Sequence, residues 1–247
     1  MRTAPAHSGA RRSTGNDIET FLGDTVPWRG GDLGLLAPQR ETAGGPPSPP
    51  PGVAGRDIYI REGCSTCHSQ LVRPFRYETE RYGEYSKAGE YVYDHPFQWG
   101  SKRTGPDLHR VGGKYPSLWH VRHMAQPDST TPGSIMPRYP HLLRSTFDTS
   151  LIGAKMRALR KVGVPYTDGE IAEAIPQMEA QARAIAAEVE SQQGPPDLAD
   201  KEIVALTAYL QRLGTDIKWK RPDTQAPYAA TVAPAAPRPA ASGAGSR

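Results

Sequence analysis

The sequence contains only two cysteines among its 247 residues, and two residues separate them. A disulfide scaffold is therefore excluded, because a single bridge between Cys64 and Cys67 would close too short a loop to constrain the chain. The sequence also lacks any run of about 18 apolar residues, so it shows no candidate transmembrane helix. Basic residues occur near its start at Arg2, Arg11 and Arg12, but the apolar stretch of a signal peptide does not follow them.

Hydrophobic residues make up only 37% of the sequence, whereas glycine and proline contribute 25 residues each. Proline is roughly twice as frequent as usual, so much of the chain is expected to lie outside a packed core. The net charge of +4 is spread along the sequence without a block of five or more like charges, and it indicates no nucleic-acid partner. These numbers favour one modest domain with long flanks.

The composition places that domain at residues 53–215. Residues 1–52 are predicted to be disordered, because they are rich in Gly, Pro, Ser, Thr and Arg and end in a proline-rich tract of the polyproline type. Residues 216–247 are rich in Ala and Pro and are also predicted to be disordered.

Within the domain, the long periodic segments have helical spacing and none alternates with period two, so we expect an all-α fold. Residues 53–63 predict a short helix that leads directly into the cysteines. Residues 71–110 are rich in aromatic side chains and show little periodicity, which indicates a long loop insertion with short helices. Further helices are predicted at 117–125, 148–162, 167–193 and 201–213.

Three residues define the ends and breaks of the later helices. Thr167 and Glu170 have the spacing of a capping box and should start a helix. Pro176 lies inside that helix and should kink it or split off its first turn. Gly214 follows the apolar face of the last helix and should end it.

The decisive motif is Cys64-Ser65-Thr66-Cys67-His68. In a c-type haem site each thiol adds to one vinyl group of the haem, and two intervening residues bring the sulfurs to the spacing of the vinyls. The histidine that follows the second cysteine then lies under the ring, where its imidazole can bind iron. We therefore predict one covalent haem c held by Cys64, Cys67 and His68, and electron transfer as its use.

Three other interpretations of the motif are weaker. A thioredoxin-like dithiol also uses Cys-x-x-Cys, but it requires a βαβ context that this sequence lacks. A structural zinc site needs four ligands, and the pair formed by His120 and His123 has no evident third and fourth partner. A chance occurrence of the motif in a chain with two cysteines is expected on the order of once in thousands of sequences.

The second axial ligand is predicted to be methionine, a soft ligand that raises the haem potential. Met136 is the preferred candidate, because prolines on both sides stiffen its loop and fix the direction of approach. Met124, Met156 and Met178 occupy helical positions where core packing is the expected role. Ligation by a second histidine stays open; the remaining histidines are His7, His95, His109, His120, His123 and His141. An iron with six ligands has no open position for substrate.

Longer segments of the domain resemble subunit II, the monohaem subunit, of the cbb3-type cytochrome c oxidases. The resemblance spans roughly residues 53–214. Its most specific part is residues 93–108, YDHPFQWGSKRTGPDL, since most c-type cytochromes lack this run. The other matching segments are GRDIYIREGC at 55–64, CHSQ at 67–70, RPFR at 73–76, ETERYG at 78–83, MP at 136–137 and VGVPYT at 162–167.

The resemblance implies a c-type cytochrome domain that passes electrons from a dihaem cytochrome subunit to the catalytic, oxygen-reducing subunit of the same complex. Carried over by position, Cys64 and Cys67 would hold the haem, and His68 and Met136 would be its axial ligands. Pro106 would resemble the proline that lines the histidine side of a cytochrome c pocket. The aromatic-rich stretch would then be either a docking surface or a small core around the haem.

The family also implies a location at the periplasmic face of the bacterial inner membrane. Members normally begin with a transmembrane anchor, whereas residues 1–52 are a polar Pro/Gly-rich tract. Membrane association is therefore expected through the complex. Two alternatives remain: a free, soluble periplasmic c-type electron carrier, and a haem-free interaction domain with unmodified cysteines.

Overall fold

The computed structural model describes residues 50–218, and all structural statements refer to this part of the chain. Its regular elements are helices, and apart from an isolated bridge between Thr146 and Lys201 it contains no strand. The predicted all-α class is confirmed. The α-helices are α3 (Pro50–Arg61), α4 (Arg76–Tyr82), α5 (Ser117–Ala125), α6 (Ile152–Lys161), α7 (Asp168–Ala172), α8 (Ala174–Ser191) and α9 (Glu202–Arg212). Short 3₁₀ turns lie between and after them: η2 (Cys64–Thr66), η3 (Ala88–Tyr91), η4 (Pro127–Ser129), η5 (Pro140–Leu143) and η6 (Asp216–Lys218).

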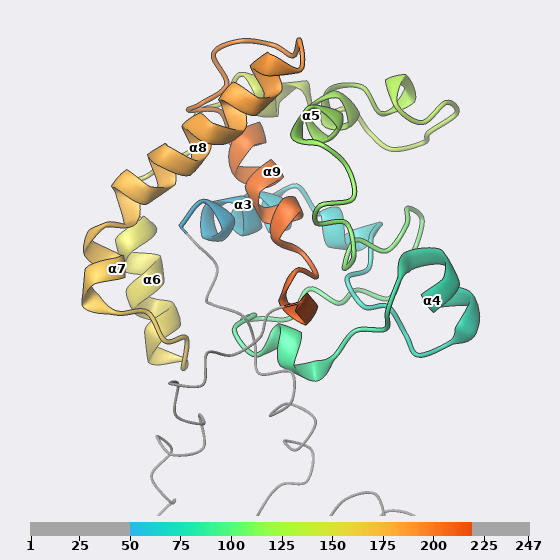
Figure 1. Cartoon of the computed structure of the whole chain (residues 1–247), viewed down its shortest axis with the longest axis horizontal. Helices are drawn as coiled ribbons and strands as arrows, with labels where there is room; N and C mark the ends of the chain where they lie inside the picture. The colour runs from blue at the N-terminus through green and yellow to red at the C-terminus, as the bar shows by residue number, and fades with distance from the viewer. Residues whose placement is uncertain (1–49, 219–247) are drawn as a thin grey trace, which may run out of the picture.

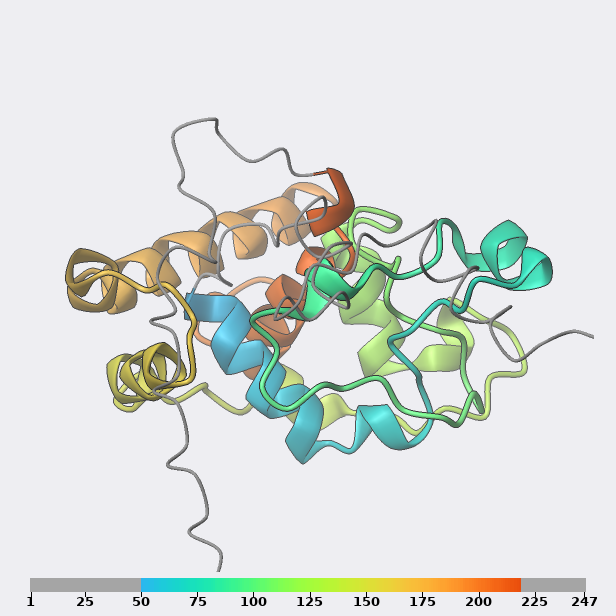
Figure 2. The same cartoon turned by 90° about the horizontal axis from the view of Figure 1, so that it is seen from below.

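Helices α3 and α9 cross at the centre of the molecule, and the other helices are arranged around this pair (Figure 1). Helices α5 and α8 pack against α9, while α6 and α8 contact α3. Helix α4 lies at one end of the molecule and α6 and α7 lie at the other, as the view from below also shows (Figure 2). The segment between the cysteine motif and α5, residues 71–116, is mostly irregular apart from α4 and η3, and it forms a lobe at the α4 end of the helical body (Figure 1).

The crossing of α3 and α9 depends on a close approach at Gly55. A Cβ atom at this position would lie 2.7 Å from the carbonyl carbon of Ala205 and 2.8 Å from the Cβ atom of Tyr209. Only a glycine leaves room for the backbone of α9 there. Ile58 and Tyr59 are buried on the same helix, so α3 adds apolar burial to the close backbone contact.

Helix α9 is more deeply buried than its sequence predicts. The spacing of its leucines and Ile203 predicts one apolar face, but every residue from 202 to 210 is buried, because α3, α5 and α8 surround the helix. The two polar residues in this run are both paired. Glu202 accepts two hydrogen bonds of 2.7 Å from Arg61, and the hydroxyl of Thr207 donates to the carbonyl of Ile203. Burial of these polar groups is tolerated because each has a partner.

Most of the predicted helix bounds agree with the observed ones to within two residues. Helix α5 spans the predicted residues 117–125. The capping box of Thr167 and Glu170 is formed, and the segment expected to break near Pro176 divides at Glu173 into α7 and α8. Gly214 follows the end of α9 with φ +67°, a left-handed conformation that stops a helix.

Two helices begin three or more residues away from the predicted start. Helix α6 begins at Ile152 and not at residue 148, because the carboxylate of Asp148 accepts a hydrogen bond from the backbone N–H of Ser150 and holds a turn. Helix α3 begins at Pro50, three residues before the predicted start, since proline is tolerated in the first helical turn.

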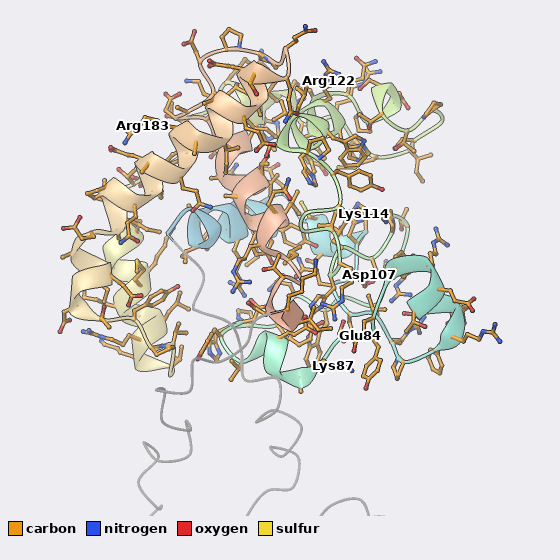
Figure 3. All side chains as sticks on the ribbon, in the orientation of Figure 1. Glu84, Lys87, Asp107, Lys114, Arg122 and Arg183 are labelled. Carbon is orange, nitrogen blue, oxygen red and sulfur yellow. The ribbon has the colours of Figure 1, made fainter. Side chains whose placement is uncertain are left out.

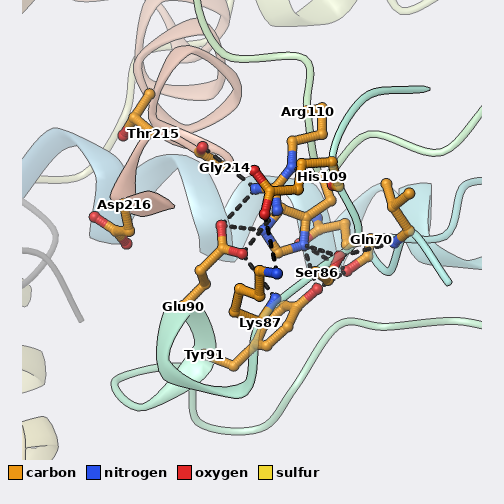
Figure 4. A network of polar contacts seen from close by, with 12 residues as sticks. Gln70, Ser86, Lys87, Glu90, Tyr91, His109, Arg110, Gly214, Thr215 and Asp216 are labelled. Carbon is orange, nitrogen blue, oxygen red and sulfur yellow. Dashed lines mark hydrogen bonds and ion pairs between the residues drawn. The ribbon is translucent and has the colours of Figure 1, made fainter. Parts of the chain in front are cut away.

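A polar network ties the lobe to the end of α9 (Figure 4). The carboxylate of Glu90 accepts from Arg110 at 2.8 Å and lies 3.1 Å from Nε2 of His109, while Arg110 also reaches the carbonyl of Gly214 at 3.3 Å. Burial raises the pKa of Glu90, but hydrogen bonds from Arg110 and His109 outweigh it and bring the pKa to about 2. The carboxylate therefore stays charged at neutral pH and holds the two segments together.

The sequence predicts disorder for residues 1–52 and 216–247. Of these, residues 50–52 belong to the first turn of α3 and residues 216–218 form η6, while residues 1–49 and 219–247 lie outside the described part of the chain. Within residues 50–218, no helix combines the length and the apolar character that crossing a membrane requires.

The substitution Gly55→Ala should destabilise the holoprotein by about 3 kcal/mol or more, because the new methyl group overlaps the backbone of α9 and forces the two helices apart. Denaturant titration of both proteins measures this loss. The matched control is Gly153→Ala in α6, where the added methyl meets the side-chain end of Arg157 at 3.5 Å and a methyl group of Ile171 at 3.9 Å. The control should be neutral or stabilising by up to about 1 kcal/mol. Equal stability of the two variants would contradict the close packing at Gly55.

Candidate haem-binding site

The cysteine motif begins at the end of α3. Gly63 adopts φ +70°, a left-handed turn that ends the helix, and Cys64 opens the 3₁₀ turn η2. The backbone N–H of His68 donates to the carbonyl of Cys64 at 2.9 Å, which closes the motif into a compact loop. The thiols of Cys64 and Cys67 are free and partly buried. Burial raises the pKa of Cys64 to about 11, so its thiol is protonated at neutral pH.

His68 is oriented by a hydrogen bond to the backbone. Its Nδ1 lies 2.7 Å from the carbonyl oxygen of Pro106. Because a carbonyl oxygen only accepts, Nδ1 carries the proton and Nε2 keeps the lone pair that a metal ion needs. Burial lowers the pKa of His68, which favours the neutral, ligating form. A histidine that binds a metal through one ring nitrogen usually donates a hydrogen bond of this kind from the other nitrogen.

The ring of His68 also packs tightly against Gly105. A Cβ atom on Gly105 would lie 2.7 Å from each of the two ring nitrogens. The backbone of Gly105 therefore forms one wall of a cradle that fixes the plane of the imidazole. The two free thiols, the oriented imidazole and this cradle fit a c-type haem, with Cys64 and Cys67 for attachment and Nε2 of His68 for iron.

Residues 103–109 form a strap against residues 67–71, and sequence patterns gave no sign of this pairing. The backbone N–H of Gly105 donates to Cys67 at 3.0 Å, and that of Leu108 donates to Ser69 at 2.8 Å. These two bonds hold the strap on either side of Pro106. The position of the carbonyl that accepts from His68 is therefore fixed by main-chain hydrogen bonds.

Asp107, in the same strap, is buried and fully bonded (labelled in Figure 3). Its Oδ2 accepts from the hydroxyl of Ser69 at 2.6 Å and from the N–H of Leu71 at 2.8 Å, while Oδ1 accepts from the N–H of His109 at 2.8 Å. The sequence includes Asp107 in the segment that resembles the oxidase family, but no residue pattern marks it as a site residue. Its role becomes visible only in three dimensions.

Met136 lies in the irregular loop between α5 and η5, as predicted. Its side chain is partly buried and packs against the hydrophobic core, and its N–H bonds to the hydroxyl of Ser134 at 3.2 Å. The loop closes where the N–H of Tyr139 donates to the carbonyl of Met124 at 2.8 Å. Burial and the charges of Cys64 and Cys67 raise the pKa of Tyr139 at the base of the loop.

The two histidines of α5 have different surroundings. The Nδ1 atom of His123 lies 2.6 Å from the hydroxyl of Thr130, and the ring stacks on Trp119 at 4.5 Å. Burial and the nearby His68 lower the pKa of His123, so this ring borders the site. His120 is fully buried, and burial lowers its pKa to about 4. Across residues 50–218, His, Cys, Asp and Glu side chains form no group of three suited to a metal ion.

The aromatic residues of the lobe are divided between core and surface. Tyr91 is buried, and the rings of Phe97 and Trp99 meet its edge. Phe97 and Trp99 stack on each other at 4.5 Å and are themselves exposed. The backbone carbonyl of Trp99 accepts from the N–H of Gln70 at 2.7 Å, so this exposed pair adjoins the haem motif. Phe75, Tyr77 and Tyr85 are also exposed.

Comparison with known protein families matches residues 39–217 to the family described as cytochrome c oxidase, mono-heme subunit/FixO. The match covers well over half of the chain and includes the haem motif, the strap and Met136. A search among curated proteins found no significant match.

The substitution Gly105→Ala should displace the ring of His68, because the added methyl occupies the space of the imidazole. We expect a changed visible spectrum and a lower content of six-coordinate haem in protein produced with a haem-attachment system. The control is Gly169→Ala in α7, where the nearest atom to the new methyl is the Thr167 hydroxyl at 4.0 Å. Spectra that match in both variants would show that the ring does not depend on this cradle.

Proposed function

Because the chain belongs to the mono-haem subunit (FixO) family of cbb3-type cytochrome c oxidases, we propose that it relays electrons through one covalently bound haem c from a dihaem cytochrome subunit to the oxygen-reducing subunit. Electron transfer within an oxidase complex follows from membership of the family. The covalent attachment, the ligands and the direction of the relay are the proposal.

The arrangement of His68 is the observation that carries the proposal. Its Nδ1–H is bonded to the carbonyl of Pro106, which leaves Nε2 with the lone pair for a metal ion, and the thiols of Cys64 and Cys67 in the same five-residue motif are free. A neutral, oriented imidazole next to two thiols in this spacing is what c-type haem attachment requires. The bound haem supplies the one-electron couple of its iron.

The residues of the chain have separate tasks in this proposal. Cys64 and Cys67 would hold the haem through thioether bonds, each thiol adding across one vinyl group with its hydrogen going to the other vinyl carbon. His68 would supply one nitrogen ligand to the iron, and the carbonyl of Pro106 keeps that ring in place. Met136 would supply the second ligand from its stiff loop. With two protein ligands the iron would have no position for substrate, so the proposed task of this subunit is electron transfer and not oxygen reduction.

The proposed location is the periplasmic face of the bacterial inner membrane, with membrane association through the oxidase complex. Haem attachment to this motif takes place outside the bacterial cytoplasm in the family that the sequence resembles. The exposed pair of Phe97 and Trp99 lies next to the haem motif and is available for contact with a redox partner. Aromatic residues are enriched in protein interfaces, which supports this use.

Haem staining of the native membrane and soluble fractions on a denaturing gel tests the central claim. A band at about 27 kDa should stain for haem, because a thioether-linked haem survives denaturation. The band should disappear in a Cys64→Ser, Cys67→Ser double variant. Staining in the membrane fraction together with co-purification of the oxidase is the expected result. Staining confined to the soluble fraction would favour a free carrier, and no staining would reject the haem.

The substitution Met136→Leu tests the second ligand. It removes the sulfur while it nearly conserves side-chain volume, so the sulfur-to-iron absorption band should weaken and the haem potential should fall. Optical spectroscopy and redox titration of the holoprotein measure both effects. Met124→Leu, a change at a buried core position in α5, is the matched control and should keep the band. An intact band in Met136→Leu would assign the ligand to another residue.

A further inference from the structure

We propose that Arg103 is a positioning residue of the haem site, which sets the haem potential through the strap that holds the Pro106 carbonyl against His68. This inference rests on the proposed function, because it concerns the ligand of the proposed haem. The guanidinium of Arg103 bonds to Ser69, Leu71 and Glu78 and not to His68 or the cysteines. Its effect therefore passes through Ser69 and Asp107.

Arg103 makes contacts with both segments that form the site. Its Nε donates to the hydroxyl of Ser69 at 2.7 Å, and its Nη2 donates to the carbonyl of Leu71 at 2.8 Å. Nη2 also lies 3.5 Å from the carboxylate of Asp107. One guanidinium group therefore joins the residue after His68 to the residue after Pro106. Only a planar group with several fixed donors can make these contacts together.

A buried carboxylate in α4 holds this guanidinium in place. Glu78 has no exposed side-chain surface, and its Oε2 accepts from Nη2 of Arg103 at 2.8 Å and from the N–H of Arg73 at 2.8 Å. The side chain of Arg73 also pairs with Glu78. A buried carboxylate without its cation would be strongly destabilising. The folded lobe therefore fixes Arg103, and Arg103 in turn fixes the strap.

The position of the strap affects His68 through its hydrogen bond to the Pro106 carbonyl. The strap is bonded to residues 67–71 by the backbone of Gly105, by the backbone of Leu108 and by the carboxylate of Asp107. A well-placed carbonyl acceptor on Nδ1–H increases the basicity of the ligating nitrogen. Greater ligand basicity stabilises the oxidised iron and lowers the potential. Loosening the strap should therefore weaken this hydrogen bond and raise the potential.

Two variants separate geometry from charge. Arg103→Lys keeps the positive charge but loses the planar set of donors. The double variant Arg103→Gln, Glu78→Gln removes one charge of each sign, so the net charge near the site is unchanged and no buried carboxylate is left unpaired at residue 78. Either variant alone keeps the test decisive if the other fails to fold. Arg76→Gln is the control. Arg76 lies in α4, the helix that contains Glu78, but its side chain is 91% exposed and pairs with Glu80 on the surface.

The measurements are redox titration of the haem-loaded protein and the exchange rate of the His68 Nδ1 proton by nuclear magnetic resonance. In both test variants the potential should rise, and the proton should exchange about three- to tenfold faster, as expected for a weakened hydrogen bond. The control should match the parent protein. Values equal to the control in a variant that stains for haem would overturn the role of Arg103. Absence of haem from the parent protein would instead reject the proposed function.

Discussion

The site depends first on the crossing of α3 and α9 at Gly55. Helix α3 ends at Arg61, three residues before Cys64, so the position of the cysteine motif follows from how closely the two backbones approach. The two helices are packed without spare room, because the backbone of Ala205 occupies the space that a side chain at residue 55 would need. Protein interiors transmit such constraints since they are close-packed. The start of the motif is thus fixed by a contact that contains no functional residue.

The lobe that faces the motif is held in a different way, by buried charge. It contains little regular structure, yet Glu78, Glu90 and Asp107 are each buried with several hydrogen bonds. A buried carboxylate costs much less free energy when its donors come from fixed positions. Such groups add little net stability compared with an apolar core, but they allow few alternative arrangements. An irregular segment can therefore present a backbone carbonyl to His68 in a defined position.

Sequence reasoning found the parts of the molecule whose signals are local. The bounds of α5, the capping box at Thr167 and the break before α8 follow from patterns within a few residues. The Cys-x-x-Cys-His motif is equally local, and the family match confirms the resemblance that residues 93–108 suggested. The all-round burial of α9 could not be predicted, because it depends on three other helices.

The roles of Arg103, Asp107 and Glu78 could not be predicted for the same reason. Each carries an ordinary charged side chain, and a charged residue in an irregular segment is normally solvated. Their partners lie up to tens of residues away in the sequence, as the pairing of Arg103 with Ser69 shows. Pro106 and Met136 were proposed from the family resemblance and from loop chemistry, and their place as haem neighbours remains a proposal. Only the folded chain reveals which charges are buried together.

The separation of the two halves of the site along the chain has a consequence for the order of assembly. The groups proposed to bind the haem covalently lie within five consecutive residues, whereas the carbonyl that orients His68 belongs to a residue 38 positions later. That carbonyl is held in place by hydrogen bonds that exist only once residues 103–109 have folded against residues 67–71. Thioether formation could therefore take place on an extended chain, before His68 receives its hydrogen-bond acceptor. In that order the imidazole of His68 would lack its hydrogen-bond acceptor until the lobe folds. The haem would then reach its final redox potential on folding and not on attachment.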